Sequence, residues 1–170
     1  MLLPDAEQLL ARLIERLQPV IAADTVIVGI HTGGVWVAQR IHDALHLSTP
    51  MGVLDISFYR DDYSKIGLHP QVKPSELPFN VENSKILLVD DVLLTGRTVR
   101  AAVNELFDYG RPACIHLAVL VDRGGRELPI NPQYAAAELS LPQNSMLELK
   151  RNESGRLSLE LRLSATEDEA

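Results

Sequence analysis

The stretch Ile86-Leu-Leu-Val-Asp90-Asp91-Val-Leu-Leu-Thr95-Gly96-Arg97-Thr98 decides the fold and the chemistry of this chain. Its apolar start, Ile86 to Val89, predicts a buried β-strand. Beyond the acid pair and a small polar turn, apolar residues recur at helical spacing, which predicts a helix that begins near Thr98. A strand, a turn and a helix N-terminus make an anion site, because exposed backbone N–H groups and the helix dipole both favour negative charge there.

The polar residues of this stretch fall into two groups with different chemistry. Gly96 allows the backbone to approach a ligand closely, and the hydroxyls of Thr95 and Thr98 are hydrogen-bond donors, so this turn suits a phosphate. Asp90 and Asp91 would repel a phosphate, and their natural targets are vicinal hydroxyls or a hydrated cation. A phosphorylated ribose presents a phosphate, a diol and a metal side by side, so the stretch predicts a site for such a ligand.

Two other interpretations of the acid pair are less favoured. Adjacent residues of a strand point to opposite faces, which argues against Asp90 and Asp91 as the facing acid/base pair that glycosidases use. A purely structural role, in which the two carboxylates cap nearby backbone and bind no ligand, is the remaining alternative.

A second strand–turn–helix unit precedes the first along the chain. Residues 25–30 are a short β-branched run that predicts a buried strand, and apolar residues at helical spacing over 35–45 predict a helix. Between them lies His31-Thr32-Gly33-Gly34, a glycine-rich turn whose backbone N–H groups can cradle another anion. A tight turn without a ligand is the alternative.

Several blocks of the sequence resemble one protein family. They are the stretch quoted first, Asp55-Ile-Ser-Phe-Tyr-Arg60-Asp61-Asp62, Gly110-Arg-Pro112, and Leu117-Ala-Val-Leu-Val-Asp122-Arg123-Gly124. Together they resemble the PyrR family of bifunctional pyrimidine operon regulators and uracil phosphoribosyltransferases, over about residues 26–130. The resemblance implies the type I phosphoribosyltransferase fold, an α/β architecture with a mainly parallel central sheet flanked by helices, a lid or hood, and a C-terminal β-hairpin.

The family likeness also implies a reaction and its participants. Uracil and phosphoribosyl pyrophosphate (PRPP) would give UMP and pyrophosphate with Mg²⁺, the metal being held mainly by ligand oxygens and water. UMP would make the protein a regulator of pyrimidine genes through binding to leader mRNA. The implied catalytic residues are Asp90, Asp91 and Arg60. The implied substrate-binding residues are Thr32, Gly33, Gly34, Asp90, Asp91, Val92, Leu93, Leu94, Thr95, Gly96, Arg97, Thr98, Val121, Asp122 and Arg123.

Three positions depart from the family pattern. The family turn Thr-Arg-Gly is Thr32-Gly33-Gly34 here, and the missing guanidinium removes a bidentate phosphate donor. His31 replaces a family lysine and is a weaker anion partner, because imidazole is mostly neutral at pH 7. Gly125 stands where the family has a histidine after Asp-Arg-Gly.

Two alternatives to the main function stay open. The first is a regulator or nucleotide sensor with weak or no transferase activity, and the second is a phosphoribosyltransferase for another base. A net charge of −7 disfavours non-specific nucleic-acid binding, and no RNA-binding motif is visible. The candidates for a local basic face are Arg12, Arg16, Arg151, Arg156 and Arg162.

The remaining sequence features concern the domain, its segments, the cellular compartment and self-association. The 170 residues fit a single domain, 1–170, and a polar, proline-containing segment, 60–83, predicts a mobile lid that excludes water from the reacting centre. Residues 51–58 alternate like a strand, and the alternating runs within 146–163 predict the hairpin. One cysteine and no apolar run long enough to span a bilayer predict a cytoplasmic protein without membrane contact. We expect a homodimer or a higher homo-oligomer.

Overall fold

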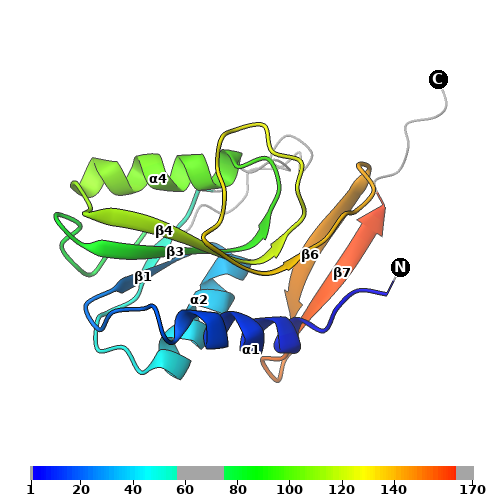
Figure 1. The fold of residues 1–170 in the computed structure, drawn as a ribbon, viewed down its shortest axis with the longest axis horizontal. Helices are drawn as coiled ribbons and strands as arrows, with labels where there is room; N and C mark the ends of the chain where they lie inside the picture. The colour runs from blue at the N-terminus through cyan, green and yellow to red at the C-terminus, as the bar shows by residue number, and fades with distance from the viewer. Residues whose placement is uncertain (1, 57–74, 164–170) are drawn as a thin grey trace.

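The described residues, 2–56 and 75–163 of a computed structural model, contain a five-stranded parallel sheet. Its strand order is β2-β1-β3-β4-β5, so the chain crosses over the sheet between successive strands (Figure 1). This arrangement confirms the predicted α/β class with a mainly parallel sheet. The strands are β1 Val26–Ile30, β2 Gly52–Leu54, β3 Lys85–Leu93, β4 Cys114–Asp122 and β5 Tyr134–Glu138.

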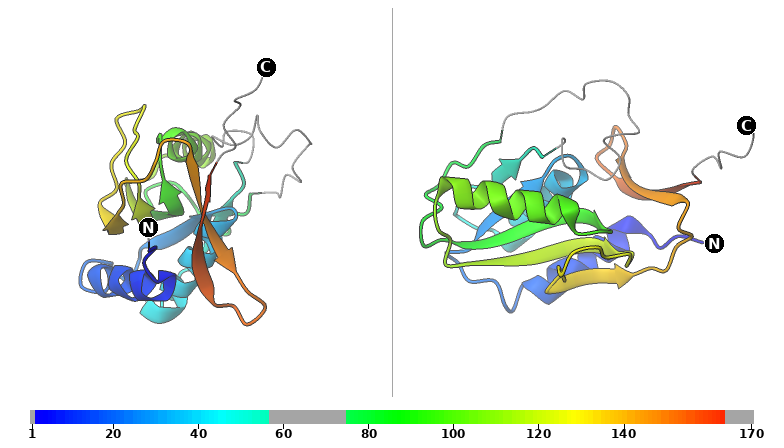
Figure 2. Two further views of the ribbon diagram at one scale, coloured as in Figure 1. Left: turned by 90° about the vertical axis from the view of Figure 1, so that its right-hand side faces the viewer. Right: turned by 90° about the horizontal axis from the view of Figure 1, so that it is seen from above.

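Helices cover both faces of the sheet and divide the core into two apolar clusters. On one face lie α1 (Ala6–Leu17) and α2 (Gly33–Leu45), and on the other lies α4 (Arg97–Tyr109) (Figure 2). Because strand side chains alternate, Leu87 of β3 packs with α1 and α2, whereas Leu88 packs with α4. Both faces of the central strands are therefore buried, which explains their continuous apolar sequence.

The helix α1 is amphipathic and is capped by a side chain at its N-terminus. The carboxylate of Asp5 caps its N-terminus by accepting hydrogen bonds from the backbone N–H groups of Glu7 (2.8 Å) and Gln8 (3.2 Å). Its apolar stripe faces the core, and the helix ends at Leu17, shortly before Pro19.

The predicted C-terminal hairpin is confirmed. Strands β6 (Ser145–Arg151) and β7 (Leu157–Leu163) pair antiparallel, and Asn152 closes the turn by accepting from the backbone N–H of Arg156. The hairpin stands apart from the sheet, beyond the carboxyl ends of its strands (Figure 1). The carboxylate of Glu7 in α1 accepts from the backbone N–H of Leu157 at 2.8 Å, which holds the hairpin against the N-terminal helix.

Three elements differ from the sequence-based expectation. The predicted strand that ended at Val89 continues to Leu93, because the backbone pairs with β4 as far as Asp122 whatever the side chains are. Strand β2 is limited to Gly52–Leu54; residues 57 and 58 of the predicted strand lie outside the described residues. The edge strand β5 was not predicted, because its alanine-rich sequence lacks β-branched residues.

Part of the segment predicted as a lid is described. Within 75–83, Glu76 forms an antiparallel bridge with Val53, and Val81 is buried against the α4 side of the sheet. Residues 60–74 of that segment, including Arg60, lie outside the described residues. Of the helices over 2–56 and 75–163, none has the length and apolar character needed to cross a membrane.

Candidate active site

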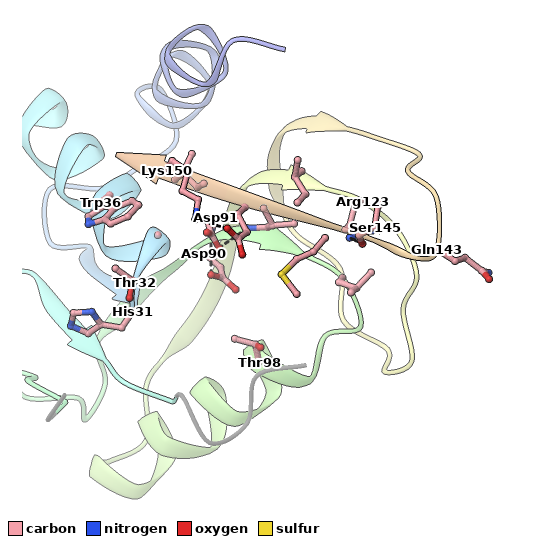
Figure 3. A pocket seen from close by; sticks show the side chains of 17 residues that line it. His31, Thr32, Trp36, Asp90, Asp91, Thr98, Arg123, Gln143, Ser145 and Lys150 are labelled. Atoms are coloured by element: carbon pink, nitrogen blue, oxygen red, sulfur yellow. Dashed lines mark hydrogen bonds and ion pairs between the residues drawn. The ribbon is translucent and has the colours of Figure 1, made fainter. Parts of the chain in front are cut away.

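A cavity of about 340 Å³ opens where the start of α2, the second half of β3 and the hairpin strand β6 meet (Figure 3). Its position outside the carboxyl ends of parallel strands is the usual ligand site of open α/β sheets. Its walls combine acidic, polar and apolar groups. The lining residues are His31, Thr32, Gly33, Trp36, Asp90, Asp91, Val92, Leu94, Thr98, Arg123, Gln143, Ser145, Met146, Leu147, Glu148, Leu149 and Lys150.

The acid pair lies in the middle of this cavity wall (Figure 3). Oδ1 of Asp90 accepts from the backbone N–H of Asp91 at 2.9 Å, and Oδ1 of Asp91 accepts from the backbone N–H of Val92 at 2.8 Å. Each carboxylate is thereby oriented by the amide of the next residue. Asp90 is buried and Asp91 is partly exposed, so the two adjacent acids have different environments although both line one cavity.

The first glycine-rich turn touches the acid pair directly. A Cβ on Gly34 would lie 2.6 Å from the carbonyl oxygen of Val89 and 3.1 Å from Cα of Asp90, so only glycine lets the start of α2 approach β3 this closely. The peptide bond between His31 and Thr32 in this turn is cis. The turn and the acid pair are therefore neighbours in one site.

The second turn connects β3 to α4. Gly96 has a φ of +92°, which favours glycine, and Oγ1 of Thr95 accepts from the backbone N–H of Arg97 at 3.1 Å. The N-cap residues of α2 and α4, Thr32 and Gly96, make no side-chain cap of the kind that Asp5 gives α1, although Thr95 accepts from the first N–H of α4. Both helix starts therefore offer backbone N–H groups to an anionic ligand.

The loop after β4 contains a partly buried guanidinium, that of Arg123. Nη1 of Arg123 donates to the carbonyl oxygen of Ser145 (2.8 Å) and Nη2 donates to that of Pro142 (3.2 Å), so this side chain joins the loop to the start of the hairpin. Burial lowers the pKa of the Arg123 guanidinium from its ordinary value. In the same loop, Arg126 forms an ion pair with Asp122 at 2.6 Å.

The structure brings about half of the predicted site residues together. Eight of them line the cavity: Thr32, Gly33, Asp90, Asp91, Val92, Leu94, Thr98 and Arg123. Arg60 lies outside the described residues, and the other predicted residues are not among the lining residues, namely Gly34, Leu93, Thr95, Gly96, Arg97, Val121 and Asp122. Val121 is buried in the core, and Arg97 forms an exposed ion pair with Glu127 at 2.8 Å.

Sequence reasoning missed the hairpin's share of the cavity. Residues 145–150 contribute a continuous wall, which includes Lys150 paired with Glu148 at 2.5 Å. Trp36, in the first turn of α2, lines the cavity beneath the guanidinium of Arg151, which lies 4.7 Å from the ring centroid. The alternation in 146–163 predicted the hairpin, but no signal in the sequence placed it over the acid pair.

The parallel sheet, the two amide-lined turns and the acid pair between them define a phosphoribosyltransferase of the type I fold. Residues 3–139 match the family described as the phosphoribosyl transferase domain. A relative named bifunctional protein PyrR from Pseudomonas syringae pv. tomato is 56% identical over 139 residues, which are 82% of this chain and 81% of the relative. Another from P. syringae pv. syringae is 50% identical over 165 residues, 95% of this chain and 96% of the relative. The chain therefore belongs to the family of bifunctional PyrR proteins.

Solved structures share the fold at lower identity. A purine phosphoribosyltransferase from Pyrococcus horikoshii superposes with a TM-score of 0.60 at 25% identity, over 78% of this chain and 81% of that one. A hypoxanthine-guanine phosphoribosyltransferase from Bacillus anthracis gives a TM-score of 0.65 at 16% identity, over 82% and 83% of the two chains. This second likeness supports the fold alone.

Proposed function

We propose that the protein is a uracil phosphoribosyltransferase that converts uracil and PRPP to UMP and pyrophosphate, and that it also regulates pyrimidine genes in response to UMP. The observation that carries this proposal is the acid pair, Asp90 and Asp91, which lines one cavity with residues of two uncapped helix starts. That arrangement matches a ribose diol between two phosphate groups, and membership of the PyrR family points to the same substrates.

The chemistry needs positioning more than covalent participation. Breaking the bond between C1 of the ribose and the pyrophosphate oxygen develops positive, oxocarbenium-like charge on the sugar, which a nearby carboxylate stabilises. Asp90 and Asp91 would accept hydrogen bonds from the ribose hydroxyls, residues 95–98 would hold the 5′-phosphate, and residues 32–34 would hold the pyrophosphate. Fixing both reactants in place supplies roughly 7–11 kcal/mol. Arg60 as a further pyrophosphate partner stays a prediction.

The base would lie toward the hairpin. The acid pair lies on β3, between β1 and β4. Strand β4 ends at Asp122, and the next residue, Arg123, lines the cavity together with Ser145 and Met146. Polar and apolar groups in the same wall suit a flat pyrimidine, whose faces are apolar and whose edge carries hydrogen-bonding groups. Of the segment 60–83 that was expected as a lid, residues 75–83 contact the sheet, and the rest is proposed as the lid that excludes water from the cation-like transition state.

Magnesium is proposed as the cofactor. The described residues contain no cluster of three or more histidine, cysteine, aspartate or glutamate side chains that would hold a metal on their own. The two adjacent carboxylates in an open cavity fit a hydrated ion whose remaining ligands are substrate oxygens and water. When bound, Mg²⁺ neutralises charge on the leaving pyrophosphate.

The transferase proposal is tested by following UMP formation from PRPP and uracil at saturating magnesium, with cytosine, hypoxanthine and guanine as parallel acceptors. We expect product from uracil alone. Absence of UMP, with binding of UMP retained, would favour a nucleotide sensor, and product from another base would reassign the acceptor.

The regulatory role requires an RNA surface. Four of the five candidate arginines are engaged within the chain: Arg16 donates to the carbonyl oxygen of Ala135, Arg151 stacks on Trp36, and Arg156 and Arg162 pair with acidic side chains. We therefore expect RNA binding to depend on an oligomer, in which the basic groups of several copies are combined. Gel shifts with pyrimidine-operon leader RNA, with and without UMP, and sedimentation of the protein alone test both parts.

The cellular compartment and the oligomeric state are proposed as well. The lone Cys114 fits a reducing compartment, so we propose a cytoplasmic location. We propose a homodimer or a higher oligomer, because the C-terminal hairpin and the α4 surface, where Phe107 and Tyr109 are exposed, offer faces for self-association.

A further inference from the structure

We call residues 94–96, between β3 and α4, the phosphate turn, and residues 123–130 the clasp loop. The clasp loop donates hydrogen bonds to three successive carbonyl groups at the end of β3 and in the phosphate turn. The carbonyl oxygen of Leu93 accepts from the backbone N–H of Arg123 at 3.0 Å. The carbonyl oxygen of Leu94 accepts from Nη1 of Arg126 at 2.9 Å. The carbonyl oxygen of Thr95 accepts from two backbone N–H groups of the clasp loop, at 2.9 and 3.2 Å.

Arg126 is the only side chain in this set of contacts, and all of its nitrogens are used. Nε donates to the carbonyl oxygen of Ile130 at 2.7 Å, and Nη2 donates to Oδ2 of Asp122 at 2.6 Å. The side chains of Arg126 and Asp122 are only 18% and 15% exposed, so this ion pair is little screened by solvent. A planar guanidinium whose other two partners are fixed holds the third, the carbonyl oxygen of Leu94, in a defined place.

Packing joins the same two segments. Gly96 adopts a left-handed backbone conformation, and a Cβ on it would lie 3.3 Å from Cβ of Ile130 in the clasp loop. On the outer side, Arg97 at the start of α4 pairs with Glu127 of the clasp loop. The phosphate turn therefore rests on the clasp loop along its whole length.

These contacts have an electrostatic consequence for an anion at the turn. Carbonyl oxygens repel a phosphate, whereas backbone N–H groups attract it. A carbonyl that is hydrogen-bonded to the clasp loop cannot rotate toward the phosphate, so the turn keeps its donors available before the ligand arrives. Such preorganisation saves the free energy that ordering the turn would otherwise cost on binding.

We propose that Arg126 is a positioning residue for the 5′-phosphate, which acts through the carbonyl of Leu94 and links the end of β4 to the phosphate turn. The inference rests on the proposed function, in that the turn holds the phosphate of a nucleotide. Arg126 does not line the cavity, so it acts without touching the ligand.

The test compares UMP with uridine, which lacks only the phosphate, by calorimetry on the full chain. Three variants are needed: Arg126→Met, Arg126→Lys, which keeps the charge but loses the fork, and Arg111→Met as an exposed control. Arg111 precedes β4, at the opposite end of that strand from the clasp loop. We expect Arg126→Met to weaken UMP about tenfold, and uridine less than about twofold. Arg126→Lys should weaken UMP by an intermediate factor, and Arg111→Met should change neither affinity.

Several outcomes would overturn the inference. Equal losses for UMP and uridine would indicate a general structural role, and unchanged UMP affinity in Arg126→Met would exclude any role in phosphate binding. If Arg126→Met does not fold, Arg126→Lys decides by the same UMP-to-uridine ratio. Failure of the unaltered protein to bind UMP more tightly than uridine would instead count against the proposed function, so the two failures are distinguishable.

Discussion

The carboxylate of Asp91 fills the space that a side chain at position 33 would need. A Cβ on Gly33 would lie 2.7 Å from Cγ of Asp91 and closer still to its Oδ2. Oδ1 of the same carboxylate is held by the backbone N–H of Val92. Position 33, where the PyrR family usually has arginine, is thus sterically linked to Asp91 in this chain.

Gly33→Ala should therefore impair catalysis by displacing Asp91. We expect kcat/KM for PRPP to fall about tenfold, because the carboxylate must leave its hydrogen-bonded position. In an Asp91→Ala background the same Gly33→Ala change should cost little, since the carboxylate that fills the space is then gone. A double-mutant cycle measures this coupling, and additive effects of the two substitutions would contradict the steric link.

Removing one charge from the acid pair should reduce activity without unfolding the protein. Asp90→Asn and Asp91→Asn keep an oxygen that can accept from the next backbone N–H, so the local structure is retained. We expect kcat/KM to fall about a hundredfold in each, because a preorganised charge near the developing cation is lost. Steady-state kinetics and urea denaturation check the two halves of this expectation. Full activity in Asp90→Asn would refute the assigned role.

The close approach of α2 to β3 predicts a stability effect at Gly34. A Cβ there would meet the backbone of Val89 and Asp90, which cannot move aside, so Gly34→Ala should lower the free energy of unfolding by about 1–3 kcal/mol. Gly124→Ala is a matched control, because Gly124 has a φ of +71° but no atom within 4 Å of a Cβ. The control should lose only about 1 kcal/mol, from backbone strain. An unchanged free energy of unfolding in Gly34→Ala would mean that packing at Gly34 is unimportant.

Glu7 should make stability depend on pH. Hydrogen bonds from Arg40 and from the backbone N–H of Leu157 hold the pKa of Glu7 below its ordinary value of 4.5. A lowered folded-state pKa contributes stability above pH 4.5, and this contribution is lost as pH falls through the lowered pKa. Glu7→Gln should therefore cost about 1 kcal/mol at pH 7 and progressively less below pH 4.5.

Denaturation curves at several pH values measure this difference. Glu153→Gln, at an exposed position in the hairpin turn, is the control and should be neutral throughout. A cost of Glu7→Gln that stays constant down to pH 3 would show that the charge of Glu7 contributes nothing.

The sequence predicted the elements that periodic apolar residues define, and it failed where tertiary contacts decide. The strand-turn-helix unit around Asp90 and the hairpin over 146–163 were visible because alternation and helical spacing are local properties. The extension of β3 to Leu93 depends on its partner strand, and β5 depends on the sheet edge and on α1, so neither has a local signature.

The same division holds for the site. The motif residues Asp90, Asp91 and Thr98 were predicted from their chemistry, and all three line the cavity. Arg126 was not singled out, because its importance comes from contacts with the carbonyl groups of residues 94 and 130, and backbone acceptors leave no trace in the sequence.

The clasp loop has a consequence for how such a protein can diverge. One short segment supports both the pyrimidine end and the phosphate end of the proposed nucleotide, through Asp122 and Leu94. Substitutions in this segment that change which nucleobase is accepted would also change the affinity for the sugar phosphate. A change of preferred base through this segment would then need compensating substitutions. We therefore expect base preference in this fold to change by substitutions in the hairpin residues that line the cavity, 145–150, sooner than by substitutions in residues 123–130.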